Sequence, residues 1–381
     1  MTALLPPRVP ASTGRRRPRS IRRRVAHLGV ASVALVVGLA WVLRTASPDV
    51  ADRAELATSG PRDPVDHPPG TGPHANLPRP SSAPPRPLAP VPPPDGRDAP
   101  DPFILADGDR YLLYNTQVGL QNVPVATSPD LRNWSPPSDA LPQLPAWAEW
   151  GRTWAPGVTR LGDRYLLYFA AHHHDSGRQC IGVATSPDAT GPFASQATEP
   201  LVCQTHLGGS IDPHPFRDHD GTPLLLWKAD GNAIGQPSTL FAQRLAPGGL
   251  SLAGEPVALL TSGARWEQPL IENPALVSTG RSYTLLYSGG WWESAGYATG
   301  YATCDTPLGP CTKATVDQPL LASGGDQAGP GGATVVTGPA GDHWLAYHGW
   351  TPGAVGYNSG GVRSLRFAAI AWSGTQPVVE R

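Results

Sequence analysis

Three acidic residues of this 381-residue chain stand in similar surroundings, each close to a proline. Asp101 lies in APDPFIL, Asp212 in GSIDPHPF and Glu272 in LIENPAL. An ionised carboxylate can activate water, and a protonated carboxyl can protonate a leaving oxygen. A third negative charge raises the pKa of the acid and so keeps it protonated near neutral pH. Three such groups at one place would suit the hydrolysis of a glycosidic bond.

The elements that must position these carboxylates repeat along the chain. A turn glycine precedes a run rich in Tyr, Leu and Trp five times, at Gly108, Gly162, Gly221, Gly280 and Gly341, with gaps of 54, 59, 59 and 61 residues. A period of this length, with a hairpin in each copy and little amphipathic helix, is typical of a β-propeller. The sequence therefore predicts an all-β, five-bladed β-propeller.

The three carboxylates stand seven to nine residues before a turn glycine, where the first strand of each copy should begin. The same place holds Trp154 and Ala155 in the second copy and Ala333 in the fifth. The innermost strands of a propeller run beside its central channel, so equivalent strand ends face one another. We therefore expect the three carboxylates to converge.

Other interpretations of the acidic residues remain open. An Asp before a proline is often only a turn or cap residue. Glu267 in RWEQPLIENP competes with Glu272 as an acid, although the start of the strand favours Glu272. Glu149 and Glu293 lack such placement.

The first 98 residues have a different character. An arginine-rich segment, residues 1–24, precedes residues 25–43, which carry no charge apart from the titratable His27. This order is typical of an uncleaved membrane anchor or of a signal peptide, and a twin-arginine export route is a further alternative. Residues 44–98 hold 15 of the 46 prolines of the chain, all between Thr45 and Asp98, and predict a disordered linker. The sequence thus predicts an extracytoplasmic protein, anchored to the cell membrane or secreted.

The predicted propeller, residues 99–381, is acidic. Residues 1–50 carry a net charge of +8, and the whole chain carries −1, which leaves −9 for the rest. This balance argues against a nucleic-acid partner. As a separate expectation, we take the protein to be a monomer.

The four cysteines form two close pairs in sequence. Cys180 with Cys203 and Cys304 with Cys311 each fall within one repeat, which favours two local disulfides in an oxidising compartment. Zinc binding is the weaker alternative, because no CxxC spacing is present.

The motifs taken together resemble glycoside hydrolase family 43. They cover residues 99–381 in order, one or more in each repeat: DP at Asp101, WAP at 154–156, SIDP around Asp212, IENP around Glu272, GPGG at 329–332, then YHGW and VRSL. The resemblance implies a five-bladed propeller and an inverting hydrolase of extracellular polysaccharide. It implies Asp101 as general base, Glu272 as general acid and Asp212 as the group that tunes the acid. In an inverting enzyme the base and acid stand roughly 6.5 to 9.5 Å apart.

Four further residues are candidates for substrate binding. Trp154 and Trp291 offer aromatic faces that can stack on a sugar, although either could instead pack within the propeller. Arg363 resembles the last-blade arginine of the family, which reaches towards the substrate and the acid, and Arg366 is the alternative. His348 is expected near the channel axis.

The sequence departs from the family where many members have a metal-binding histidine. The region after GPG reads GATVV, without that imidazole ligand, so we expect no required cofactor. A structural calcium or a monovalent ion in the channel stays open as an alternative. His172, His173 and His174 are interpreted as a solvated loop, of which at most one reaches the sugar.

Several functions stay open at this point. Our first expectation is an α-L-arabinofuranosidase, with an endo-arabinanase, β-xylosidase or galactofuranosidase of the same family as alternatives. A non-catalytic carbohydrate-binding propeller is a different class, but binding alone does not require the carboxylates. A retaining fructosidase or a sialidase would need closer carboxyls or an arginine cluster with a tyrosine nucleophile.

Overall fold

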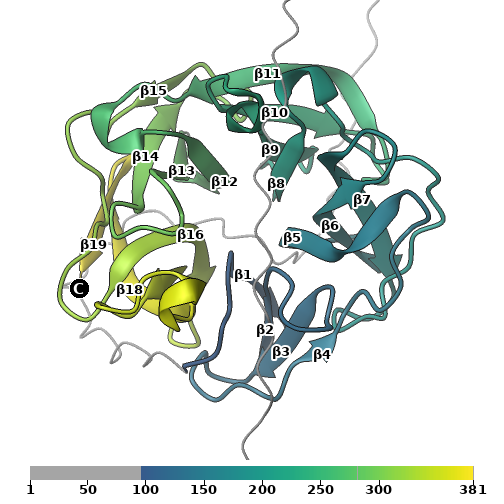
Figure 1. The fold of residues 1–381 in the computed structure, drawn as a ribbon, viewed down its shortest axis with the longest axis horizontal. Helices are drawn as coiled ribbons and strands as arrows, with labels where there is room; N and C mark the ends of the chain where they lie inside the picture. Colours follow the sequence, from purple (N-terminus) through teal and green to yellow (C-terminus); the bar gives the residue numbers. More distant parts are fainter. Residues whose placement is uncertain (1–95, 281, 381) are drawn as a thin grey trace, which may run out of the picture. The chain divides into compact units, whose positions relative to one another are not determined.

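The computed structural model describes residues 96–280 and 282–380, which form five antiparallel sheets around a central axis (Figure 1). The prediction of an all-β, five-bladed propeller is confirmed. Each sheet is built from consecutive strands, and the first strand of each lies nearest the axis. Blade 1 contains β1 Phe103–Asp107, β2 Arg110–Tyr114, β3 Pro124–Ser128 and β4 Ser138–Asp139; blade 2 contains β5 Ala148–Leu161, β6 Arg164–His173 and β7 Arg178–Ser186.

The other three blades have four strands each, and four short 3-10 helices lie between strands. Blade 3 contains β8 Ser210–Arg217, β9 Pro223–Ala229, β10 Thr239–Leu245 and β11 Leu252–Thr261; blade 4 contains β12 Ile271–Ser278, β13 Tyr283–Gly289, β14 Ala298–Cys304 and β15 Cys311–Lys313; blade 5 contains β16 Ala328–Thr337, β17 His343–Trp350, β18 Ser364–Ser373 and β19 Gln376–Glu380. The helices are η1 Thr205–Leu207, η2 Gly231–Ile234, η3 Arg265–Glu267 and η4 Tyr357–Ser359.

The hairpin between the first two strands of each blade turns on the predicted glycine. Gly108, Gly162, Gly221, Gly280 and Gly341 all have positive φ values, which a residue with a side chain adopts only at a cost in energy. Because the inner strand runs towards this turn, its starting end lies at the opposite rim of the channel. The segments after β2, β13 and β17 return to that same rim.

The ring closes through contacts between blade 1 and blade 5. Strands β1 and β16 lie against each other, and Asp98 forms an antiparallel bridge with Ser364. The backbone N–H of Ala99 donates to the carbonyl of Arg363 at 2.9 Å. Side chains of both blades share one buried core, which includes Ile104, Leu113, Trp344 and Phe367. Contacts that close the ring thus include Asp98.

The two predicted disulfides are confirmed. Cys180, in β7, is joined to Cys203, and Cys304, at the end of β14, is joined to Cys311 in β15. Each bond links segments of the chain that are near in sequence. The disulfides therefore brace single blades or the segment that follows them, and they do not close the ring.

The expected N-terminal segments lie outside the described residues. This applies to the basic segment 1–24, the apolar segment 25–43 and nearly all of the Pro-rich linker 44–98. Among the residues that the structure does describe, no helix has the length and apolar character needed to cross a membrane.

Candidate active site

Five equivalent positions at the starting ends of the inner strands share an unusual backbone conformation. Asp101, Ala155, Asp212, Asn273 and Gly332 have φ values of 51°, 43°, 56°, 52° and 63°. Four of them carry side chains in the left-handed region, which costs energy and is common at functional sites. All five line one small cavity at the centre of the propeller.

This pattern corrects the register expected for Glu272. The residue equivalent to Asp101 and Asp212 is Asn273, and each of these three precedes a proline. Glu272 stands one position earlier, in β12, and reaches the site from there. Sequence spacing missed the shift because a window of seven to nine residues cannot distinguish neighbouring positions.

Asp101 is held by hydrogen bonds and by a positive charge. Its Oδ2 accepts from Thr116 Oγ1 at 2.7 Å and lies 3.6 Å from Arg363 Nη1. Thr116 Oγ1 also accepts from the N–H of Ala155 at 2.7 Å, which fixes the hydroxyl. Burial favours the neutral acid, but the Arg363 charge and the hydrogen bonds outweigh it and leave the pKa of Asp101 below its ordinary value. An ionised carboxylate at this place can act as a base.

Asp212 has the opposite tendency. Its side chain is buried, and its Oδ2 accepts from the N–H of Asn273 at 2.9 Å. Burial first, and then the nearby charge of Glu272, raises the pKa of Asp212 well above the ordinary value for an aspartate. Asp212 and Glu272 therefore form a pair that resists carrying two negative charges.

Glu272 is held at both of its carboxylate oxygens. Oε2 accepts from Lys228 Nζ at 2.9 Å, and Oε1 accepts from Tyr297 Oη at 2.8 Å. Lys228 lies in β9, next to the inner strand of blade 3, while Tyr297 lies just before β14. Blades 3 and 4 thus fix the carboxyl group of one residue, Glu272, which is 7% exposed.

A chain of hydrogen bonds joins the expected base to the expected acid. Asn273 Nδ2 donates to Asp101 Oδ1 at 3.4 Å and to Tyr297 Oη at 3.1 Å, and Tyr297 donates in turn to Glu272. These three bonds share atoms end to end, so Asp101 Oδ1 and Glu272 Oε1 cannot be farther apart than their combined length. That length stays within roughly 9.5 Å, the upper limit for the separation of the two carboxyl groups of an inverting glycosidase. The structure therefore brings Asp101, Asp212 and Glu272 together at one end of the channel.

Arg363 and His348 both lie against Asp101. Arg363 was expected to reach towards the acid, but it forms an ion pair with Asp101, and its guanidinium stacks 4.7 Å from the ring of Trp292. His348 is fully buried, and its Nδ1 accepts from the N–H of Asp101 at 3.0 Å. The expectation that His348 binds the substrate is therefore corrected: a ring buried behind Asp101 supports that residue and is not available to a sugar.

Exposed aromatic side chains surround the same rim. Trp154 is 36% and Trp291 is 46% exposed, whereas Trp292 packs between Trp350 and Arg363. Trp150 in the β5 segment and Tyr357 in η4 are also exposed. Trp150 and Trp154 lie in the starting half of the inner strand β5, and Trp291 and Tyr357 lie in the segments that follow β13 and β17, so all four can offer apolar faces at this end of the channel.

The competing residues lie elsewhere. Glu267 is fully buried in η3, where its Oε2 pairs with Lys313 at 2.6 Å and accepts from two backbone N–H groups, so it is a structural residue. His172 and His173 belong to β6, and the expected loop begins only at His174. His172 Nδ1 lies 2.8 Å from Glu149 Oε2, which gives that glutamate a partner on the hairpin.

The described residues do not fit a calcium site. Within residues 96–280 and 282–380, the group of three His, Cys, Asp or Glu close enough for one ion is His173, Cys180 and Cys203, and both cysteines are in a disulfide. At the axis, His348 Nδ1 accepts a hydrogen bond, so the neutral ring carries its proton on Nε2 and offers no lone pair there. Burial, helped by the Arg363 charge, lowers the pKa of His348 to about 3, so the ring is neutral. Calcium prefers six to eight oxygen ligands, which these side chains do not supply.

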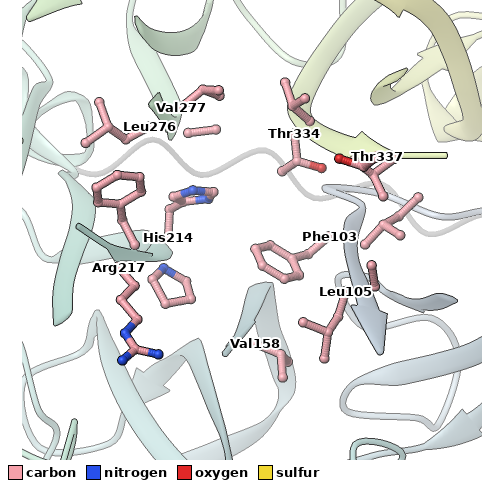
Figure 2. Close-up of a pocket in the computed structure, with 16 residues that line it drawn as sticks. Phe103, Leu105, Val158, His214, Arg217, Leu276, Val277, Thr334 and Thr337 are labelled. Carbon is pink, nitrogen blue, oxygen red and sulfur yellow. The ribbon is translucent and has the colours of Figure 1, made fainter. Parts of the chain in front are cut away.

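A second cavity, of about 250 Å³, lies along the inner strands beyond the first. Figure 2 shows its lining, in which Phe103, Leu105, Val158 and Leu276 contribute apolar surface and His214 and Arg217 contribute polar groups. None of the three carboxylates lines it. The chemistry therefore belongs to the starting ends of the strands.

Sequence reasoning missed four residues of the site: Lys228, Asn273, Tyr297 and Thr116. Asn273 had a signal, since ENP repeats the position of DP in the first and third repeats. Lys228 also had one, because a lysine within the apolar run LLLWK must find a buried partner. Thr116 and Tyr297 come from returning segments, whose course the sequence does not specify.

Comparison with known proteins agrees with this geometry. The profile of the family described as Glycosyl hydrolases family 43 matches residues 95–376. The chain is 28% identical over 247 residues to an extracellular endo-α-(1→5)-L-arabinanase of Thermotoga petrophila, covering 55% of this chain and 50% of that protein. It is 28% identical over 238 residues to the β-D-galactofuranosidase xynD of Aspergillus niger, covering 58% and 64%. The chain thus spans about half to two thirds of these curated relatives.

Solved structures give the same picture. A thermostable family-43 glycoside hydrolase is 27% identical and superimposes with a TM-score of 0.67, covering 74% of this chain and 93% of that one. A Bacteroides thetaiotaomicron protein described as an endo-1,4-β-xylanase is 26% identical, with a TM-score of 0.64 and coverage of 74% and 94%.

Proposed function

Because the chain belongs to family 43 of the glycosyl hydrolases, we propose that it hydrolyses glycosidic bonds of a polysaccharide with inversion at the anomeric carbon. The observation that carries this proposal is the convergence of Asp101, Asp212 and Glu272 at one rim of the channel, where hydrogen bonds from Asn273 and Tyr297 link them. Binding alone requires no such set of carboxylates. A non-catalytic propeller is therefore the less favoured alternative.

Each carboxylate receives one role in the proposed reaction. Asp101, kept ionised by Arg363, takes a proton from a water molecule whose oxygen attacks the anomeric carbon. As the bond from that carbon to the leaving oxygen breaks, Glu272 gives its proton to that oxygen. Asp212 disfavours a second negative charge at the pair and so helps Glu272 to hold its proton until that step.

The best-supported substrate class is a polymer of pentose or galactofuranose units. The relatives are named as arabinanases, a galactofuranosidase and a xylanase, which favours arabinose, galactofuranose or xylose as the sugar that the enzyme recognises. Exposed Trp150, Trp154 and Trp291 around the rim favour stacking on more than one sugar. Within this class we propose removal of terminal α-L-arabinofuranosyl units first and internal cleavage of arabinan second.

We further propose that the enzyme acts outside the cytoplasm, as a monomer, and needs no cofactor. Two disulfides favour an oxidising compartment, and relatives from Thermotoga petrophila and Bacillus subtilis are named as extracellular. Activity that disappears on chelation and returns with calcium would contradict the proposal that the enzyme needs no cofactor.

The test identifies the sugar with a panel of 4-nitrophenyl glycosides and then compares the variants on arabinan, xylan and a galactofuranan, whose sugar leaving groups need protonation. We expect hydrolysis by the wild type and a loss of about 10²–10⁴-fold or more in Asp101→Asn and Glu272→Gln. Circular dichroism and the Tm serve as controls for folding. Wild-type turnover by either folded variant would overturn the assignment, and binding of oligosaccharide without any turnover would favour the non-catalytic alternative.

A further inference from the structure

A buried lysine lies directly behind the proposed acid. Lys228 is 1% exposed, and its Nζ lies 2.9 Å from Glu272 Oε2 and 2.9 Å from Asp230 Oδ1. A buried ammonium is stable only with charged or hydrogen-bonding partners, so both contacts hold it in place. Lys228 thereby fixes one oxygen of Glu272, while Tyr297 holds the other.

The positive charge of Lys228 acts against the role of a general acid, and the negative charge of Asp230 offsets part of this effect. A positive charge at this distance favours a negative charge on the Asp212–Glu272 pair, whereas a general acid must keep its proton. Asp230 shares the same ammonium and therefore offsets part of its effect. Three other titratable groups lie around the acid: Asp212 within β8, Asp101 just before β1 and Tyr297 just before β14.

We propose that Lys228 is a positioning residue for Glu272, and that Lys228 and Asp230 together set the upper pH limit of hydrolysis by opposing effects on the Asp212–Glu272 pair. This inference rests on the proposed function, since it takes Glu272 as the acid. The contacts with both carboxylates are geometric and hold whatever the substrate.

The direction of each effect follows from the charges. Removing the positive charge of Lys228 disfavours ionisation of the pair, so the acid keeps its proton to a higher pH. Removing the negative charge of Asp230 leaves the ammonium uncompensated, so the acid loses its proton at a lower pH. Burial alone would lower the pKa of Lys228, but the negative charges of Glu272 and Asp230 outweigh burial and raise that pKa above its ordinary value. The ammonium therefore stays charged.

The experiment measures kcat/KM against pH for the wild type, Lys228→Met and Asp230→Asn on phenyl α-L-arabinofuranoside, whose poor leaving group needs protonation. We expect the alkaline limb to move up by about one pH unit in Lys228→Met and down by about half a unit in Asp230→Asn. Lys313→Met is the matched control, because it removes the chain's other lysine, which pairs with buried Glu267 away from the site. Its alkaline limb should equal that of the wild type.

Opposite shifts distinguish electrostatic tuning from mere damage to the structure. Unchanged limbs in both folded variants, or shifts of both in the same direction, would overturn the proposal. Should Lys228→Met fail to fold, the sign of the Asp230→Asn shift decides. If the wild type hydrolyses no substrate, the proposed function fails, and ¹³C NMR titration of the carboxyls still tests whether the two variants move the pair in opposite directions.

Discussion

At the scale of single residues, the site works by giving chemically similar groups different surroundings. Asp101 has Arg363 and Thr116 beside it and favours its ionised form, whereas Asp212 is buried beside a second carboxylate and favours its neutral form. The environment thus distinguishes the base Asp101 from the buried Asp212–Glu272 pair, which contains the acid and resists a second negative charge. The acidic limb of a pH profile should report Asp101, and the alkaline limb should report the Asp212–Glu272 pair.

Removal of the Arg363 charge tests this separation. Because the guanidinium lowers the pKa of Asp101, Arg363→Gln should raise it and move the acidic limb of kcat/KM up by about one pH unit. Arg366→Gln is the matched control, since Arg366 is also buried but pairs with Asp326. If the acidic limb moved in Arg366→Gln and not in Arg363→Gln, the assignment of this role to Arg363 would be wrong.

At the scale of elements, the sequence predicted the blades well and the returning segments poorly. Turn glycines such as Gly108 and Gly341 marked the hairpins, because a local backbone requirement leaves a local signal. Asp101 and Asp212 were placed by the same repeat. The partners of Glu272, by contrast, come from β9 and from the segment before β14, and long-range packing leaves no regular spacing in the sequence. The place of His348 behind Asp101 was missed for the same reason.

Close packing between blades 4 and 5 should matter for the acid. A methyl group on Gly331, in β16, would overlap the ring of Tyr297, which donates to Glu272. Gly331→Ala should therefore cost about 1–3 kcal/mol of stability and lower kcat more than KM changes. Gly248→Ala, at a glycine with open space around it, is the control. Wild-type kcat in a folded Gly331→Ala protein would show that Tyr297 does not position the acid.

At the scale of the whole described propeller, closure of the ring and function depend on the same residues. Asp98 accepts from the N–H of Arg363 at 2.8 Å and from Tyr357 Oη at 3.0 Å, so it joins the start of blade 1 to the segment before β18. Each described sheet consists of consecutive strands, so side-chain and backbone contacts of this kind hold the first and last blades together. The same contacts place Arg363 beside Asp101.

Loss of the Asp98 carboxylate should therefore weaken both closure and catalysis. Asp98→Ala leaves the N–H of Arg363 without its partner, and we expect a loss of about 1–3 kcal/mol in stability together with a lower kcat/KM. Asp163→Ala, at an exposed turn position, controls for the removal of one surface charge. A lower Tm in Asp98→Ala with unchanged kcat/KM would separate closure from the site.

The central claim is that Asp101 and Glu272 act on opposite sides of the anomeric carbon as base and acid. It is tested most directly by ¹H NMR of the first product formed by the wild type from an aryl α-L-arabinofuranoside, recorded before the anomers equilibrate. Attack by water in a single step predicts that the β-anomer appears first. First appearance of the α-anomer would mean a covalent intermediate and would contradict these roles for Asp101 and Glu272.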